Sequence, residues 1–210
     1  MEAGVLALQG GFREHVAVIR SLGVNCREVK LPNDFDGLDC LIVPGGESTT
    51  IGKLAVEYGL IDPIVDFAAQ NKPVWGTCAG AIFLSKLTGV NQPVLRLIDI
   101  EVERNAFGRQ VDSFEAEVTT NLSQMPGNDS SNDGEGKGVF PGVFIRAPRI
   151  VVVGPSVDVL GRLSTGEVVA VRQRNLLVTV FHPELTGDRR FHQYFLGMLS
   201  DQVKTGLRVD

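Results

Sequence analysis

The sequence lacks the features that mark membrane, secreted and nucleic-acid-binding proteins. No apolar run approaches the roughly 20 residues that a membrane helix needs, and no basic segment precedes the first apolar stretch as in a secretory signal. Only three cysteines occur in 210 residues, an odd number that suits a reducing compartment better than a disulfide framework. The formal charge of −5 argues against a general affinity for nucleic acid or anionic membranes. We therefore expect a cytoplasmic protein that binds neither.

The N-terminal part alternates short apolar runs with segments of helical periodicity. The run GVLAL is typical of a strand that is buried on both faces. The expected strands lie at 4–8, 25–29, 39–43 and 73–75, and the expected helices at 12–22, 50–58 and 61–71. Ser48 or Thr49 is the expected cap of the second helix. This alternation predicts a mostly parallel sheet with helices on both faces.

After about residue 95 the pattern changes to successive strands with short turns. These strands are expected at 98–104, 113–118, 142–147, 149–153, 167–172 and 176–181. They form either the antiparallel part of a mixed sheet or a small lobe laid over one end, and a helix at about 187–204 closes the chain. The polar stretch 121–138 is expected to be a mobile surface loop. The predicted fold class is α/β: one domain, residues 1–210, with a flavodoxin-like three-layer fold, a mixed, mostly parallel sheet flanked by helices, and a small antiparallel portion.

Cys78 lies in a turn that a structural cysteine does not need. The motif GTCAG, residues 76–80, joins an expected strand to an expected helix, which is the pattern of the nucleophile elbow Gly-x-Ser-x-Gly with sulfur in place of oxygen. We expect the two glycines to prevent collisions in the sharp turn, and the helix start at Ala79 to favour the thiolate. The alternative is a buried structural cysteine, which is our interpretation of Cys26 and Cys40 because they lack such a turn.

His182 is the predicted base for this nucleophile. A thiolate that attacks an acyl carbon needs a proton shuttle, usually a histidine. Of the three histidines, His15 and His192 fall in expected helices, whereas His182 follows the last expected strand at its carboxyl end. If the backbone stays extended, His182 and Glu184 point to one face, so that Glu184 holds one ring nitrogen while the other faces Cys78. The alternative is an ordinary surface His–Glu pair.

A second glycine-containing loop, PGGES, follows the third expected strand and borders the same crevice. Its glycines free the backbone amides to bind an anion, and we expect the amides of Gly46 and Ala79 to hold an oxyanion. The nearby Gly52-Lys53 pair does not make a phosphate loop, because five residues rather than four separate Gly46 from Gly52 and Leu54 stands where Ser or Thr is required. We therefore expect no nucleotide site, and no Cys/His cluster has the spacing of metal ligands.

Together these motifs resemble the class I, or triad, glutamine amidotransferases. The resemblance narrows to the glutaminase subunits of ribose-5-phosphate-dependent pyridoxal 5′-phosphate synthases and extends from Gly4 to about Phe195. The motifs that carry it are ALQGGFREH, PGGESTT, WGTCAGAIFL, ERNAFGRQVDSFEA, GVFIRAP and FHPELTGD. The cysteine and His-Pro-Glu motifs specify only the superfamily, whereas residues 103–115 and the GVFIRAP segment specify the subfamily. The stretch 121–138 departs from the family pattern and looks like an insertion.

The resemblance implies a reaction and a set of site residues. Glutamine is hydrolysed to glutamate and ammonia through a thioester on Cys78, with His182 as base and Glu184 as its orienting partner. The residues that the resemblance implies for binding glutamine are Gly46, Glu47, Ser48, Arg104, Ile145 and Arg146. An arginine suits the α-carboxylate of glutamine, since a guanidinium can donate two hydrogen bonds to it. The reaction uses no metal and no cofactor.

The resemblance also implies a protein partner. Family glutaminases pass ammonia to a barrel-type synthase subunit that makes pyridoxal 5′-phosphate, and the two assemble as twelve copies of each. That partner activates the glutaminase, and the loop around Gln9 is expected at the interface. Two alternatives stay open: another cysteine hydrolase or deglycase on a similar sheet, and an inactive glutaminase that serves only in assembly.

Overall fold

The computed structural model describes residues 1–104, 113–122 and 138–205, with the side chains of 200–205 left out. Its elements in chain order are β1 Glu2–Leu6, α1 Phe12–Ser21, β2 Asn25–Val29, the 3₁₀ helix Pro32–Phe35, β3 Cys40–Val43, α2 Ser48–Glu57, α3 Ile61–Ala69, β4 Val74–Thr77, α4 Ala79–Leu84, β5 Ser85–Leu87, β6 Ile98–Glu103, β7 Ser113–Thr120, β8 Gly138–Ile145, β9 Arg149–Val153, β10 Asp158–Leu163, β11 Val168–Gln173, β12 Leu176–Thr179, the 3₁₀ helix Pro183–Leu185 and α5 Arg190–Thr205.

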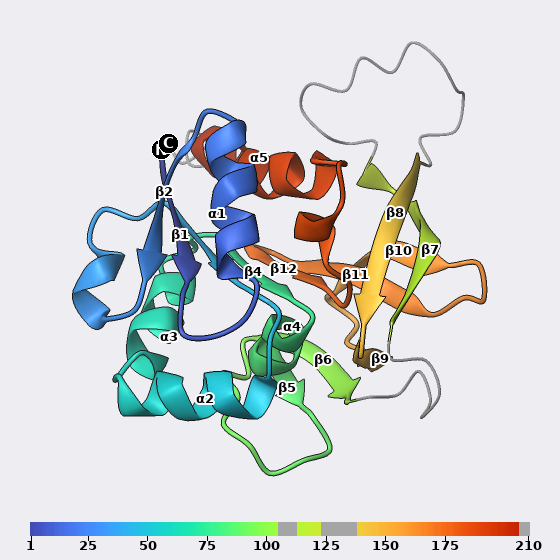
Figure 1. The fold of residues 1–210 in the computed structure, drawn as a ribbon, viewed down its shortest axis with the longest axis horizontal. Coiled ribbons are helices and arrows are strands. Elements are labelled where there is room, and N and C mark those ends of the chain that lie inside the picture. The colour runs from blue at the N-terminus through green and yellow to red at the C-terminus, as the bar shows by residue number, and fades with distance from the viewer. Residues whose placement is uncertain (105–112, 123–137, 206–210) are drawn as a thin grey trace.

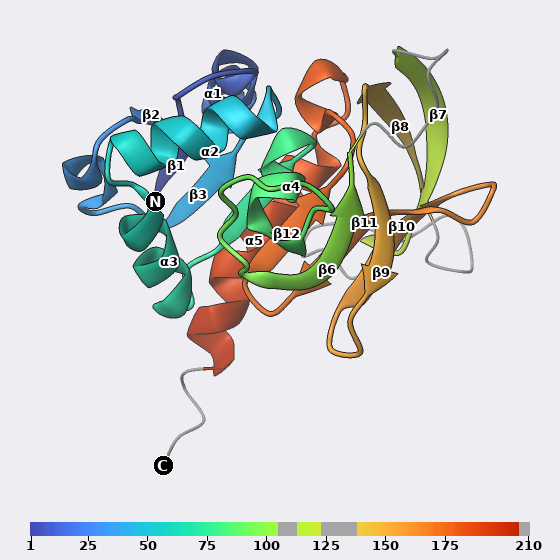
Figure 2. The same cartoon turned by 90° about the horizontal axis from the view of Figure 1, so that it is seen from below.

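A large mixed sheet crosses the molecule (Figure 1). Among the described residues its strand order is β2-β1-β3-β4-β12-β11-β10-β7-β8. The pairings from β2 to β12 are parallel, and those from β12 to β8 are antiparallel. Helices α1 and α5 cover one face of the parallel half, and α2, α3 and α4 cover the other (Figures 1 and 2). The predicted three-layer α/β fold with a mixed sheet is confirmed.

A second, small sheet lies beside the main one. In the described part of the chain it has the order β5-β6-β9, with β5 parallel and β9 antiparallel to β6, and Figure 2 shows it in front of β10 and β11. Both of the arrangements left open for the C-terminal strands are therefore present. Sequence reasoning did not predict β5 or β10. The first has three residues, and the second carries Gly161 at a register shift, where glycine weakens the strand signal.

Several predicted bounds shift, and one predicted cap is wrong. Strand β1 is Glu2–Leu6 rather than 4–8. Helix α2 begins at Ser48, and its N-cap is Glu47 rather than Ser48 or Thr49, because the Glu47 carboxylate accepts hydrogen bonds from the amides of Thr49 and Thr50. A carboxylate at this position satisfies two amides at once, so that it replaces the shorter hydroxyl caps. The predicted surface loop 121–138 lies outside the described residues except for 121, 122 and 138.

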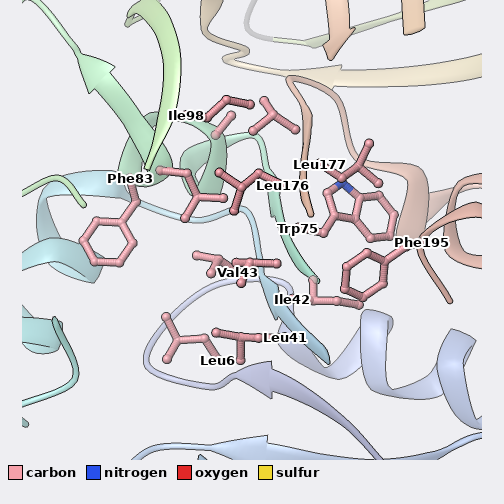
Figure 3. Packing of buried hydrophobic residues seen from close by; sticks show 14 of the residues in the cluster. Leu6, Leu41, Ile42, Val43, Trp75, Phe83, Ile98, Leu176, Leu177 and Phe195 are labelled. Atoms are coloured by element: carbon pink, nitrogen blue, oxygen red, sulfur yellow. The ribbon is translucent and has the colours of Figure 1, made fainter. Parts of the chain in front are cut away.

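The core fills the space between the parallel strands and the helices. Trp75, Leu177 and Phe195 pack together on one side of the sheet (Figure 3), and all three side chains are fully buried. The indole nitrogen of Trp75 donates a hydrogen bond to Oγ1 of Thr179 at 3.2 Å. This packing fixes β4 beside β12, and the paired strands end together, with Thr77 opposite Thr179. Residues that follow these two strands are therefore held at one edge of the sheet.

No helix in the described ranges is long and apolar enough to cross a membrane.

Candidate active site

Cys78 directly follows β4 and directly precedes α4. Its φ of 46° and ψ of −103° lie outside the usual regions for a residue with a side chain. The amide of Cys78 donates to the carbonyl of Thr179 at 2.9 Å, and its carbonyl accepts from the amide of Ala81 at 3.1 Å. The turn is thus tied to both the neighbouring strand and the helix. Such backbone strain is typical of functional positions, because the surrounding structure must hold it.

The two glycines of the motif are required by close backbone contacts, as predicted. A Cβ at Gly76 would lie 2.6 Å from the carbonyl oxygen of Gly80, and a Cβ at Gly80 would overlap the carbonyl oxygen of Val43. Neither neighbour is a flexible side chain that could move aside. Cys26 and Cys40 are buried thiols, and burial raises the pKa of both, to about 11 for Cys26. This fits their predicted structural role.

His182 and Glu184 lie close together, but not through the geometry that the sequence suggested. Pro183–Leu185 is a 3₁₀ helix rather than an extended segment. Within this tight turn Nδ1 of His182 lies 2.8 Å from Oε1 of Glu184. The amide of His182 also donates to the carbonyl of Val143 in β8 at 2.8 Å. The turn therefore joins the end of the parallel half of the sheet to the antiparallel hairpin.

The electrostatics of these side chains match a nucleophile–base pair. Burial disfavours the charged His182 ring, but its hydrogen bonds with Cys78 and Glu184, and their negative charges, raise its pKa to about 10. Burial works against the Glu184 carboxylate as well, yet the nearby rings of His15 and His182 lower its pKa. The site thus holds a cationic imidazole between a sulfur and a carboxylate near neutral pH.

The Gly45–Gly46 loop closes over this pair. The carbonyl of Gly45 accepts a hydrogen bond from the amide of Gly11 at 3.0 Å. Oε1 of Gln9 accepts from the amide of Glu47 at 2.6 Å. The loops after β1 and β3 are therefore bonded to each other at the carboxyl edge of the sheet, where ligands bind in open α/β folds.

A pocket of about 440 Å³ opens at this edge. All of the predicted site residues line it: Gly46, Glu47, Ser48, Cys78, Ala79, Arg104, Ile145, Arg146, His182 and Glu184. Sequence reasoning did not assign Gly10, Gly11, Glu14, Pro148 or Leu185 to the site, although they line it too. The glycine pair after β1 was the available signal, because it follows a parallel strand just as PGGES does.

Arg104 and Glu47 form an ion pair in the pocket wall. Nη2 of Arg104 lies 3.0 Å from Oε1 of Glu47, and Nη1 donates to Oγ1 of Thr49 at 2.9 Å. Although burial favours the protonated acid, hydrogen bonds from Thr50 and Thr49 lower the pKa of Glu47 to about 2. The carbonyl of Ile145, which also lines the pocket, lies 3.8 Å from Sγ of Cys78. Arg104 and Glu47 thus place a cation and an anion in the wall of the pocket that Cys78 also lines.

His15 and His192 are the side chains that sequence reasoning passed over. Both are fully buried, and Nε2 of His15 lies 3.3 Å from Oε2 of Glu184. Helical periodicity alone could not have found them, because a histidine among apolar positions usually indicates only a core face.

Comparisons with known proteins agree with this geometry. The sequence profile of the SNO glutamine amidotransferase family matches residues 5–201. A pyridoxal 5′-phosphate synthase subunit PdxT from Herpetosiphon aurantiacus is 52% identical over 202 residues, which cover 94% of this chain and 100% of the relative. One of the same name from Dehalococcoides mccartyi is 50% identical over 206 residues, or 96% and 98% of the two chains.

Solved structures extend the comparison to three dimensions. A crystal structure described as a glutamine amidotransferase has a TM-score of 0.83 at 47% identity, covering 94% of this chain and 98% of its own. PurLQS from Thermotoga maritima has a TM-score of 0.67 at 16% identity and covers 99% of both chains, so it shares the fold alone. The family resemblance that the motifs predicted is thereby confirmed. Because the family profile spans nearly the whole chain, this protein belongs to the SNO glutamine amidotransferase family.

Proposed function

We propose that this protein hydrolyses the side-chain amide of L-glutamine to give L-glutamate and ammonia. The observation that carries the proposal is the arrangement of Cys78, His182 and Glu184 in the lining of one pocket, with Nδ1 of His182 hydrogen-bonded to Glu184 and Cys78 close enough to raise the pKa of the same ring. A nucleophile, a base and an orienting acid in this order form a triad, which is recognised by geometry rather than by sequence position.

In the proposed reaction the Cys78 thiolate attacks the amide carbon of glutamine. The carbonyl oxygen becomes an oxyanion, and the amides of Gly46 and Ala79 are the proposed donors to it. His182 then gives its proton to the departing nitrogen, so that ammonia leaves and a thioester remains on Cys78. The neutral imidazole next takes a proton from water, and the resulting hydroxide attacks the thioester. Glutamate and the thiolate–imidazolium pair are the products, so the site returns to its starting state.

The pocket walls account for the choice of glutamine. Arg104 is the proposed partner of the α-carboxylate, because its guanidinium can donate two parallel hydrogen bonds. Glu47 is the proposed partner of the α-ammonium, since its low pKa keeps it anionic. Ser48, the backbone of Ile145 and Arg146 complete the proposed contacts from two sides of the pocket. Recognition of both α-groups would exclude simple amides that lack them.

The ammonia needs an acceptor protein. Free ammonia becomes ammonium at neutral pH and loses its nucleophilicity, so it must be delivered directly. Curated relatives carry the name pyridoxal 5′-phosphate synthase subunit, which supports a role in vitamin B6 synthesis beside a synthase subunit. We propose that this subunit is a (β/α)8 barrel, that twelve copies of each chain assemble in the cytoplasm, and that the loop around Gln9 belongs to the interface.

The decisive experiment measures glutamate release from L-glutamine by the wild-type chain and by Cys78→Ala, each alone and with the cognate synthase subunit. We expect strong release only by the wild type with its partner, and a mass increase on Cys78 after treatment with the glutamine analogue 6-diazo-5-oxo-norleucine. Equal glutamate release with and without the partner would support the proposed reaction but would show that the synthase subunit does not activate it. Folded wild-type protein without activity in either condition, or full activity of Cys78→Ala, would overturn the proposal.

A further inference from the structure

The three histidines and Glu184 form one chain of side-chain contacts, in which His182 and His15 contact the carboxylate and His192 contacts His15. His182 bonds Oε1 of Glu184 from one side, and His15 approaches Oε2 from the other at 3.3 Å. Nδ1 of His15 in turn lies 3.0 Å from Nε2 of His192. These residues come from α1, α5 and the turn after β12, so elements distant in sequence converge on the acid of the proposed triad. The proposed chemistry uses only His182 of the three.

The setting of His15 and His192 is apolar and closed. Both side chains are fully buried, and the ring of Trp75 packs edge-on against each, with ring centroids 5.6 Å and 4.9 Å apart. Burial lowers the pKa of both histidines below the ordinary value of 6.5, which favours the neutral form of each ring near pH 7. Each ring therefore has one N–H and one bare nitrogen, and the contacts decide which is which.

The ionised carboxylate favours one direction for the hydrogen bonds in this group. Oε2 of Glu184 can only accept, so its 3.3 Å contact with Nε2 of His15 is favourable when that nitrogen carries the proton, and Oγ1 of Thr77 can accept from the same N–H. Nδ1 of His15 is then bare, and it accepts from the Nε2–H of His192. Nδ1 of His192 is left bare, which fits its having no hydrogen-bond partner among the described residues.

His15 can provide an N–H donor to the buried Oε2 of Glu184. This oxygen is buried and makes no regular hydrogen bond within the described ranges. Nε2 of His15 lies 3.3 Å from it and also 3.3 Å from Oγ1 of Thr77, so an N–H on this nitrogen places the positive end of a dipole beside the carboxylate. A buried carboxylate oxygen without a donor is costly. Loss of the His15 N–H would favour rotation or protonation of Glu184, and either change would release the His182 ring.

We propose that the buried His15–His192 pair is a positioning device for the proposed triad: His192 holds His15 in its Nε2–H tautomer, and His15 holds Glu184 ionised and aligned on His182. The proposal rests on the glutaminase function proposed above. Neither histidine touches substrate. Their effect reaches the reaction through the orientation of one carboxylate.

The test compares three substitutions with a matched control. His15→Leu removes both ring nitrogens, His15→Gln keeps an amide N–H near the position of Nε2, and His192→Phe keeps the aromatic packing on Trp75 but removes the donor to His15. Phe195→Leu is the control, because Phe195 packs on the same Trp75, with ring centroids 5.4 Å apart, and is fully buried. Phe195→Leu reduces packing in the same part of the core but leaves the polar side chains of His15, His192 and Glu184 in place.

The readouts are kcat and KM for glutamine with the synthase subunit present, the melting temperature, and the rate at which iodoacetamide alkylates Cys78. For His15→Leu we expect kcat to fall by about 10- to 100-fold, the worth of one hydrogen bond to a charged group, with KM nearly unchanged and alkylation slowed. His15→Gln should restore most of kcat, and His192→Phe should fall between them. Phe195→Leu should lower the melting temperature and leave kcat intact.

The tautomers are tested directly by ¹⁵N NMR of the ring nitrogens in protein labelled at histidine, since protonated and bare nitrogens resonate in separate regions. We expect Nε2 of His15 to be protonated and Nδ1 to be bare. A bare Nε2, a wild-type kcat in His15→Leu, or an equal loss of kcat in Phe195→Leu would overturn the proposal. If the wild type releases no glutamate, the glutaminase function fails, but the ring assignments and alkylation rates still decide the role of His15.

Discussion

Gly45 lies against the His182 ring so closely that a Cβ at position 45 would overlap Cε1 of the imidazole. The same Cβ would lie 3.2 Å from Cβ of Cys78. A methyl group there must therefore push the His182 ring away from Cys78. We expect Gly45→Ala to lower kcat by about 100-fold, the scale of a 1 Å misplacement of reacting groups, in glutamate-release assays with the synthase subunit.

The control for this substitution is Gly187→Ala. Gly187 follows the turn at Pro183–Leu185, which begins just after His182. A Cβ at position 187 would meet nothing within 4 Å. Its kcat should match the wild type, and circular dichroism should find both variants folded. Near-wild-type activity in Gly45→Ala would mean that the His182 ring can move aside without cost.

The Arg104–Glu47 ion pair is expected to govern affinity rather than turnover. Arg104→Gln removes the proposed partner of the α-carboxylate, and we expect KM for glutamine to rise by about 10- to 100-fold with kcat changed much less, because this contact is made equally in the ground and transition states. Arg162→Gln, at an exposed position of β10, is the matched control. If kcat fell and KM stayed constant, Arg104 would act on the chemistry instead.

The three thiols should differ sharply in reactivity. In folded protein at pH 8 we expect iodoacetamide to modify Cys78 rapidly and to leave Cys26 and Cys40 unmodified, because burial raises the pKa of both. All three should react in urea. Mass spectrometry of the digested protein locates the modified residues, and Cys78→Ser should abolish rapid labelling. Rapid labelling of Cys26 in the native state would contradict its structural role.

The buried histidines predict a maximum of stability near pH 6.5. His192 has its pKa lowered from 6.5 to about 2 and His15 also has a lowered pKa, so below pH 6.5 the unfolded chain binds protons that the folded chain refuses. Stability then falls as pH falls, by up to about 1.4 kcal/mol per pH unit for each group. His182 has its pKa raised from 6.5 to about 10, so its contribution is complete below pH 6.5 and is lost as pH rises through 10.

Urea unfolding at a series of pH values checks the loss of stability on both sides of pH 6.5. Unfolding is monitored by the fluorescence of the single tryptophan, Trp75, which is fully buried. In His192→Phe the free energy of unfolding should depend less on pH between pH 6.5 and 5. In His182→Gln it should depend less on pH between pH 7 and 10. A wild-type slope in both variants would show that other groups carry the pH dependence.

Sequence reasoning found those parts of the site that local chemistry dictates. Cys78 was predictable because its turn needs glycines on both sides, and the whole motif lies within residues 76–80. His182 was predictable because it follows a buried strand at its carboxyl end. The predicted catalytic and binding roles remain predictions, but all of the residues concerned line one pocket.

The parts that sequence reasoning missed depend on contacts across the fold. His15 and Glu184 are distant in the chain, and only the packing of α1 against the turn at Pro183–Leu185 brings them together. Strand β10 was missed because Gly161 interrupts its pattern, while its pairing with β7 and β11 compensates. Glu47 was taken only as a ligand for glutamine, although it also caps α2, because capping statistics favour the shorter serine and threonine that follow it.

The register of β4 beside β12 has a consequence for how the protein is made. Val74 pairs with Leu176 and Thr77 with Thr179, so the strand that lies beside the proposed nucleophile is synthesised long after Cys78 itself. A nascent chain that ends before residue 176 has the thiol of Cys78 but lacks both the proposed base, His182, and the strand that precedes it. We therefore expect a chain truncated before residue 176 to release no glutamate from glutamine. The proposed site forms only after β12 and the turn at Pro183–Leu185 have been synthesised.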